Sequence, residues 1–210
     1  LGVVLENGGL FDDTRRLFKQ SEQGSAELAI INSVQEGLAA QLDFRAIVDL
    51  VGNKIREIFN TKDMSIALYD RQTGLLSMPY YLEHGDRFPV EAMPLAGGFT
   101  GHIIRTRQPL LINRDVMRRA AEFGSRMIGD LNSANTPISY AGVPILKGDE
   151  AIGVVALYGE KEDAFVESDV RLLTTLANAM TVALENARLF DETQRLFKAE
   201  QQRAAELAII

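Results

Sequence analysis

One segment of this chain occurs twice, and the repeat limits what the chain can fold into. Residues 5–31 read LENGGLFDDTRRLFKQSEQGSAELAII and residues 184–210 read LENARLFDETQRLFKAEQQRAAELAII, with 18 identical positions and no gap. Repetition at a fixed spacing indicates a modular architecture. The unit is therefore one module with a copy of the same connector at each end. We expect a longer parent protein with several such modules in series, and an output domain outside this chain.

Both connector copies have the hydrophobic spacing of a helix that pairs with another helix. Apolar residues recur every seven positions, with one step of eleven in the first copy, which suits a coiled coil that departs from a perfect heptad. Stripes of this length predict a parallel homodimer, and the alternative is an amphipathic helix that packs on its own domain. The residues expected in this dimer and connector seam are Leu10, Leu17, Phe18, Ala183, Phe190 and Phe197.

Composition excludes several classes of function. The net charge of −7 argues against nucleic acid or an anionic membrane as the main partner. The sequence contains no cysteine, which excludes disulfides, thiolate catalysis, cysteine-ligated metals and cofactors attached through a thiol. We find no apolar run of the roughly 18 to 20 residues that span a bilayer, and no signal peptide. We expect a cytoplasmic protein without membrane insertion.

The hydrophobic period between the connectors predicts an α+β fold. Period 3.6 changes to period 2 near Met64, and two apolar runs joined by the turn Lys147–Glu150 predict a central hairpin. Helices are expected over Leu10–Gln41, Phe44–Phe59 (capped by Asp43), His102–Thr106, Asp115–Ile128 and from Ser168 onward. Strands are expected at Met64–Asp70, Leu75–Gly85, Phe88–Leu95, Pro109–Asn113, Ser139–Leu146 and Ala151–Gly159. This order describes a mostly antiparallel sheet with helices from both ends of the chain on one face.

The last helix is expected to continue into the second connector without a break. Residues 167–210 contain neither proline nor glycine, the residues that most often end helices. We therefore expect the final helix of the domain and the connector to form one rod.

Three segments together resemble the GAF domain family: GFTGHIIRTRQPLLINRD at 98–115, SYAGVPILKGDEAIGVVALYG at 139–159 and AFVESDVRLLTTLANAMTVALENARLF at 164–190. The resemblance covers about Ala26 to Leu189. It implies a six-stranded, mostly antiparallel sheet with helices on both faces, a ligand cavity opposite the terminal helices, and dimerisation through those helices. It also implies a sensory role in a multi-domain, bacterial-type signalling protein. We divide the chain into a connector at 1–25, a GAF domain at 26–188, and a connector at 189–210 that leads to a further repeat.

The resemblance leaves the ligand and any cofactor unknown. Members that bind cyclic nucleotides carry an N-K…F-x-x-x-D-E signature after the last strand. Lys161, Phe165 and Asp169 match it here, but Glu160 replaces the asparagine and Val170 the final glutamate. Members that hold a bilin usually attach it through a cysteine.

Six residues on elements expected beside the cavity are the candidate pocket: Tyr80, Phe99, Thr100, Arg114, Ser139 and Tyr140. Aromatic side chains at these positions could stack on a planar ligand, although they could equally be core. Arginines at 114, 118, 119 and 126 could clamp an anion, and the alternative is a solvated helix face. His102 could ligate haem iron, or be an ordinary helix histidine. We expect no catalytic and no metal site, since the residues lack the required spacing.

Two functions stay open, and a third is disfavoured. The first is a sensory module that passes a ligand or partner signal through coiled-coil helices to an output domain. The second is a structural spacer and dimerisation module with a ligand-free cavity filled by Met78, Tyr80, Phe99 and Met127. The third is an enzyme such as the methionine-sulfoxide reductases of this fold. Those enzymes use cysteines, so we expect no enzymatic activity.

Overall fold

The computed structural model describes residue 24 and residues 27–38, 43–125 and 136–207. Within this part of the chain the core element is a seven-stranded sheet in which every paired strand is antiparallel to its neighbour. Its order is β3-β2-β1-β7-β6-β5, where β3 pairs with the end of β2 and β4 pairs with the start of β2. The strands are β1 (Asp63–Asp70), β2 (Leu75–Glu83), β3 (Asp86–Arg87), β4 (Met93–Pro94), β5 (Leu110–Ile112), β6 (Ser139–Lys147) and β7 (Glu150–Gly159).

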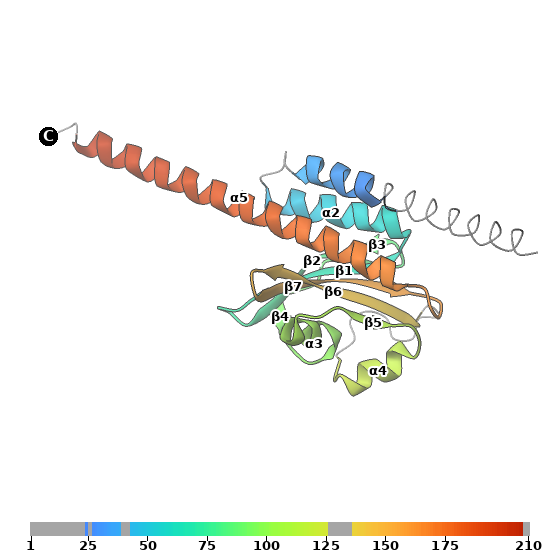
Figure 1. The fold of residues 1–210 in the computed structure, drawn as a ribbon. Helices are drawn as coiled ribbons and strands as arrows, with labels where there is room; N and C mark the ends of the chain where they lie inside the picture. Colours follow the sequence, from blue (N-terminus) through green and yellow to red (C-terminus); the bar gives the residue numbers. More distant parts are fainter. Residues whose placement is uncertain (1–23, 25–26, 39–42, 126–135, 208–210) are drawn as a thin grey trace, which may run out of the picture.

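Helices cover both faces of this sheet, as Figure 1 shows. Residues 27–38 are helical and lie with α2 and α5 on one face, while α3 and α4 lie on the other. The helices named in the figure are α2 (Phe44–Phe59), α3 (Gly98–Thr106), α4 (Val116–Glu122) and α5 (Glu167–Leu207). The expected α+β class, with a mostly antiparallel sheet and helices on both faces, is confirmed, but the described sheet has seven strands where six were expected.

Helix α2 forms where the sequence predicts it, because both of its ends are chemically specified. The Asp43 carboxylate accepts a hydrogen bond from the Ala46 N–H at 2.9 Å, which satisfies one of the free donors of the first turn. At the other end Asn60 takes a left-handed conformation (φ 45°), and its N–H donates to the carbonyls of Arg56 and Glu57. Ile47, Val51 and Ile55, spaced by four residues, are buried against the sheet.

The hydrophobic core is divided by the sheet into two unequal parts. The larger cluster lies between the sheet and α2, α5 and the helix at 27–38, and includes Val34, Val51 and Leu173. The smaller lies under α3 and α4, where Phe99 and Ile103 pack on Tyr140 and Val154. The face that carries α3 therefore has the smaller of the two clusters.

The predicted third strand, Phe88–Leu95, is wrong. In its place the structure has two strands of two residues each, Asp86–Arg87 and Met93–Pro94, which both pair with β2. Prolines at 89 and 94 lack the N–H that a continuous ladder requires. The segment therefore leaves the edge of the sheet and returns to it.

Two helix boundaries also differ from the prediction. Helix α3 begins at Gly98, four residues before the expected His102. Helix α4 ends at Glu122 and not at Ile128, because Gly124 follows with a left-handed backbone (φ 67°) that ends the helix.

Helix α5 runs for 41 residues from Glu167 to Leu207 without interruption, so this part of the predicted rod is one helix. Its start lies one residue before the predicted cap, and the Asp169 carboxylate accepts from the Val166 N–H at 2.8 Å. The last residue of this helix in the core is Ala187, and the helix then projects beyond the domain (Figure 1).

The predicted dimer seam is placed only in part. Leu10, Leu17 and Phe18 lie outside the described residues. Ala183 is buried in the core of its own domain at 5% exposure, so its assignment to a seam between chains is wrong. It lies on the part of α5 that still covers the sheet. Phe190 and Phe197, past the end of the domain, are 43% and 60% exposed.

Candidate ligand cavity

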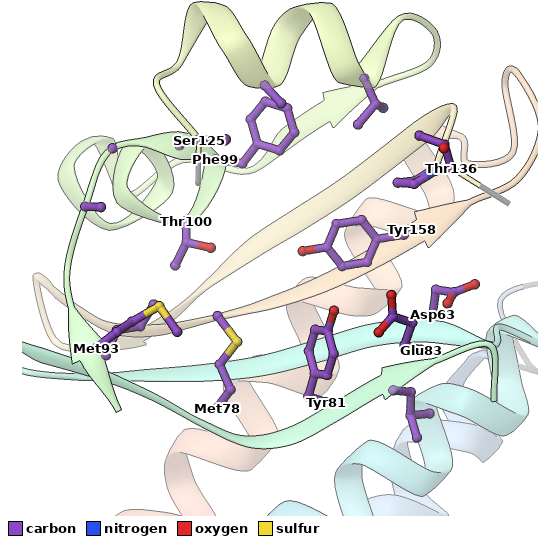
Figure 2. Close-up of a pocket in the computed structure, with 18 of the residues that line it drawn as sticks. Asp63, Met78, Tyr81, Glu83, Met93, Phe99, Thr100, Ser125, Thr136 and Tyr158 are labelled. Atoms are coloured by element: carbon purple, nitrogen blue, oxygen red, sulfur yellow. The ribbon is translucent and has the colours of Figure 1, made fainter. Parts of the chain in front are cut away.

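A cavity of about 510 Å³ lies between the sheet and α3, on the face opposite α2 and α5. Its floor comes from β1, β2 and β7, and its roof from α3, the preceding loop and α4 (Figure 2). This size is within the range of pockets that enclose small organic ligands. The position is the one that the family resemblance implies.

A bulge in β2 decides which side chains enter the cavity. Ile66 of β1 pairs with Tyr80, whereas Leu68 pairs with Ser77, so the register shifts by one residue between them. The shift changes which face alternate residues point to. Met78 and Tyr81 therefore both line the cavity, while Tyr80 points to the opposite face.

The candidate pocket residue Tyr80 is accordingly placed outside the cavity. Its ring packs under α2 so closely that a Cβ at Gly52 would overlap it. Its hydroxyl hydrogen-bonds to Oδ1 of Asn53 at 2.9 Å, and the side chain is fully buried in the larger core cluster. Tyr80 therefore holds α2 on the sheet and cannot contact a ligand in the cavity.

Phe99 and Thr100, from the first turn of α3, do line the cavity. Figure 2 shows the Thr100 side chain directed toward the floor. Phe99 packs on the Phe123 ring at 5.5 Å between centroids and on Tyr140 at 4.7 Å. The aromatic packing fixes the start of α3 above the sheet. Contact of these two residues with a ligand stays a prediction.

The other three candidate residues lie away from the cavity. Arg114 forms an exposed ion pair with Asp163 at 3.0 Å. Ser139 is buried on the α5 side of β6, next to Phe165. Tyr140 is fully buried under α3, and among the described residues its hydroxyl has no hydrogen-bond partner.

The remaining basic residues and His102 also have other partners. Arg118 pairs with Asp115, and Arg119 pairs with Glu122 on the same helix face. Arg126 lies outside the described residues. The described arginines of this segment therefore lie on a solvated surface, which is the alternative given above to an anion clamp. His102 packs edge-on against the Phe123 ring at 4.8 Å between centroids and does not line the cavity.

Two tyrosines that the candidate set lacks face the cavity directly. Tyr81 of β2 and Tyr158 of β7 both line it, and Figure 2 shows their hydroxyls directed into the space below α3. Burial, then Glu83, Tyr158 and Asp63, raise the pKa of Tyr81. Burial also raises the pKa of Tyr158, against a hydrogen bond with Ser65 that lowers it. Both hydroxyls therefore stay protonated at neutral pH.

The two ends of the cavity differ in polarity. Met78 and Met93 lie together at one end (Figure 2), with Leu76 among the lining residues. The other end carries the carboxylates of Asp63 and Glu83 (Figure 2). Asp63 begins β1 and Glu83 ends β2, and since Met64 pairs with Leu82, both acids emerge at the same end of the strands.

Asp63 is held in place by the neighbouring turn. Its Oδ1 accepts a hydrogen bond from the His84 N–H at 2.7 Å, and the His84 imidazole Nδ1 lies 3.8 Å from the same oxygen. A third acid, Glu160, follows β7 and also lines the cavity. Among the described residues no lysine or arginine lines it.

Over 27–38, 43–125 and 136–207 we find no group of three histidines or acids able to hold a metal ion. No helix in the described part of the chain combines the length and apolar character needed to cross a bilayer.

Two curated bacterial regulators are similar to most of this chain. One is the formate hydrogenlyase transcriptional activator of Salmonella typhimurium, 26% identical over 170 residues that cover 80% of this chain and 24% of that protein. The other is the Nif-specific regulatory protein of Herbaspirillum seropedicae, 26% identical over 185 residues, or 83% of this chain and 34% of that protein. The chain thus spans about a quarter to a third of the length of these relatives.

A solved structure gives the same fold at lower sequence identity. The GAF domain of an Acinetobacter phosphoenolpyruvate-protein phosphotransferase superposes with a TM-score of 0.66 at 14% identity, covering 78% of this chain and 95% of that domain. The sequence model of the GAF domain family matches residues 41–185, from just before α2 to well inside α5. On this match, supported by the antiparallel sheet and its helices, the chain belongs to the GAF domain family.

Proposed function

We propose that this chain is a sensory module that binds a small molecule in the cavity and transmits its occupancy through α5 to an output domain elsewhere in the parent protein. The observation that carries the proposal is the path of β7. Tyr158, Gly159 and Glu160 line the cavity, and α5 begins at Glu167. The cavity floor and the rod are therefore consecutive parts of one chain.

The packing behind β7 supports mechanical coupling to α5. A Cβ placed on Gly159 would overlap Oγ of Ser139 and lie 3.2 Å from the Phe165 ring. Phe165 is buried in the larger core cluster together with Val170 and Leu173 of α5. A ligand that displaces the end of β7 therefore pushes on Phe165, and through it on the first turns of the rod.

Transmission requires that α5 has two arrangements. A ligand shifts their populations only by the ratio of its affinities for them, and each tenfold ratio corresponds to about 1.4 kcal/mol. The mixed seven- and eleven-residue spacing of the connector allows more than one register of a helix pair. The relatives are regulators by name, which agrees with a role in control and not in chemistry.

We propose that the module acts as a parallel homodimer through the distal half of α5. Leu189, Phe190, Leu196 and Phe197 lie beyond the domain and are 43% to 61% exposed. Two pairs of large apolar residues, seven positions apart, form a stripe along one side of a free helix. The same four letters occur at 10, 11, 17 and 18, so a preceding module would supply an equivalent stripe. We propose that the GAF domain, residues 26–188, is one of several similar modules arranged in tandem in the parent protein.

The second candidate function is a ligand-free spacer, and the length of α5 favours it as much as it favours the sensor. The two functions differ in the cavity, which a spacer would fill with its own side chains and a sensor would leave open for a ligand. Met78 and Phe99, expected to fill it, line its wall, and Tyr80 lies outside it. Met127 lies outside the described residues. We propose no catalytic role, since the chain has no cysteine.

Native mass spectrometry of the purified chain tests this function. We expect a dimer that carries the additional mass of a retained small molecule or that acquires it from a metabolite extract. A dimer that never gains mass would favour the spacer, and a bare monomer would contradict both.

A further inference from the structure

We infer that adjacent modules of the tandem array share one continuous helix, in which the final turns of one module's α5 are the first helix of the next module, residues 27–38. This inference rests on the tandem arrangement proposed above and adds how one module meets the next. It comes from the overlap between the two copies of the connector and from the packing of the helix at 27–38.

The two copies of the connector overlap in helical structure as well as in sequence. Positions 206–207 end α5, and positions 27–28, which carry the same letters Glu-Leu, begin the helix at 27–38. When the copies are superposed, α5 of one module therefore continues directly into the first helix of the next. The joined helix has about 50 residues and a length of roughly 75 Å.

The receiving end of the joined helix is part of a hydrophobic core. Val34 and Leu38, one turn apart, are 1% and 4% exposed and belong to the larger core cluster. Gly37 lies so close to α2 that an added Cβ would be 3.1 Å from a methyl carbon of Leu50. Glycine inside a helix costs stability, and here it permits the close approach of two helices. The helix at 27–38 is therefore a structural element of the module that receives it.

The other end of the joined helix is fixed in the core of the preceding module. Ala183 and Ala187 of α5 are each 5% exposed and belong to the larger core cluster. The two connector copies are offset by 179 positions, which places Val34 of the next module 26 residues after Ala187. The two anchored ends are thus separated by about 39 Å of helix. A helix anchored in a core at each end transmits rotation and translation between the modules.

Helix α2 connects the incoming helix with the outgoing one inside each module. It lies against the helix at 27–38 at Leu50 and packs against α5. Asn53 of α2 also holds the Tyr80 hydroxyl of β2 at 2.9 Å. Displacement of the incoming helix therefore acts on α2, and through it on α5 and on a strand whose other face lines the cavity. Because linkage is reciprocal, occupancy of one module should change the ligand affinity of its neighbour.

A two-module chain tests the shared helix directly. Continuing this sequence after Ile210 with residues 32–210 keeps the same letters at the join, since Ile210 is equivalent to Ile31. Spin labels at Asn178→Cys of the first module and Glu36→Cys of the second, both at exposed positions, are 37 residues apart along the helix. Pulsed electron spin resonance, with labelled chains diluted in unlabelled ones, should give a narrow distance distribution centred near roughly 55 Å.

A proline variant gives the reference for a broken join. Gln201→Pro interrupts α5 between the two labels, beyond the domain, and Gln201→Ala is the matched control. We expect the proline variant to give a broader distribution with a shorter mean, and the alanine variant to match the unchanged two-module chain. A distribution in the unchanged chain as broad as that of the proline variant would overturn the shared helix.

Insertions in the parent protein give a second measurement that does not depend on the two-module chain. Two alanines inserted after Gln201 turn the next module by about 200° around the helix axis, whereas seven turn it by only about 20°. We expect the two-residue insertion to weaken the response of the output by about fivefold or more, the size of a typical allosteric coupling, and the seven-residue insertion to preserve most of it. Equal effects of the two insertions would contradict a continuous helix.

The outcomes separate this inference from the proposed ligand-binding function. The native mass spectrum of the single chain reports a bound small molecule whatever the join between modules is. A chain that never gains mass would contradict the sensory function and leave the shared helix standing. A broad distance distribution in the two-module chain would overturn the shared helix and leave the cavity a ligand site.

Discussion

Lys147, at the turn of the β6–β7 hairpin, forms an ion pair with Glu185 of α5, with 2.7 Å between Nζ and Oε2. The other carboxylate oxygen of Glu185 lies 3.0 Å from a guanidinium nitrogen of Arg188 on the next turn of the helix. The bridge joins the end of the hairpin farthest from Tyr158 to α5 close to the point where the helix leaves the domain. The rod is thus tied to the sheet at two places, here and through Phe165.

This bridge predicts a specific dependence of stability on pH. Hydrogen bonds from Arg188 and then Lys147 lower the pKa of Glu185 from 4.5 to about 2. A carboxyl whose pKa is depressed in the folded state stabilises that state above its unfolded pKa. The contribution of Glu185 should therefore be complete above about pH 4.5 and fall as the pH drops toward 2.

The measurement is urea unfolding of the wild-type chain and of the Glu185→Gln variant at several pH values between 4.5 and 2. The difference in the free energy of unfolding between them should shrink between pH 4.5 and 2. Glu200→Gln, an exposed acid on the free part of the same helix, is the control and should show no such trend. A difference for Glu185→Gln that is independent of pH would contradict the assignment.

The close approach of Gly52 to Tyr80 predicts that α2 has no room for a side chain there. Gly52→Ala would drive a methyl group into the buried Tyr80 ring and should destabilise the fold by about 1–3 kcal/mol. Gly24→Ala is the matched control, since Gly24 is helical with nothing within 4 Å of an added Cβ, and should stabilise by up to about 1 kcal/mol. Chemical denaturation measures both. Equal effects of the two changes would show that Tyr80 does not pack as described.

The two neighbouring tyrosines of β2 should separate stability from binding. Tyr80→Phe removes the hydrogen bond to Asn53 and should cost about 0.5–1.5 kcal/mol of stability, with ligand affinity unchanged. Tyr81→Phe removes a hydroxyl that faces the cavity and should change the affinity for a ligand of the cavity more than stability. Denaturation and calorimetry on both variants check this. The reverse pattern would mean that the bulge in β2 is misplaced.

The exposed stripe on α5 should control association and not folding. Replacing Leu196 and Phe197 together by serine removes two apolar side chains that are about 60% exposed in one chain. We expect a monomer with an unchanged sheet, measured by sedimentation equilibrium and by circular dichroism. Val166→Ser, at an equally apolar and 54% exposed position before α5, should stay dimeric. A dimer that survives the double change would place the interface elsewhere.

A break in the rod should separate binding from output. Gln194→Pro interrupts α5 beyond Ala187, where proline costs a helix about 3 kcal/mol without touching the core. In the parent protein we expect ligand binding to persist and the response of the output to be lost, whereas Gln194→Ala should behave as wild type. Retained regulation in the proline variant would contradict transmission along α5.

Much of the fold could be predicted from periodicity alone, and the failures have local causes. Helix α2 and the β6–β7 hairpin carry unbroken patterns and strong end signals, so their positions were predicted closely. The strand expected at Phe88–Leu95 fails because its prolines break the ladder, which a hydrophobic count does not register. Ala183 fits a heptad, but periodicity does not say whether a helix packs on its own sheet or on another chain.

The candidate site was harder to predict than the fold. Phe99 and Thr100 line the cavity because α3 begins at Gly98, before the expected His102, and their contact with a ligand stays a prediction. Tyr80 was misassigned because a one-residue bulge reverses the faces of β2. The sequence does not indicate whether Tyr80 or Tyr81 faces the cavity. Asp63 and Glu83 come together only through strand pairing, which the sequence pattern does not specify.

The central claim, that cavity occupancy changes the arrangement of the rods, is tested most directly by a distance between labels on two copies of α5. The chain has no cysteine, so Gln202→Cys gives a single site for a spin label on the exposed part of the helix. Pulsed electron spin resonance then measures the separation in the dimer, with and without a saturating amount of the small molecule that the native mass spectrum identifies. We predict a distance distribution that shifts between two populations when the ligand binds. An identical distribution in the two states, with calorimetry showing the ligand bound, would contradict the account.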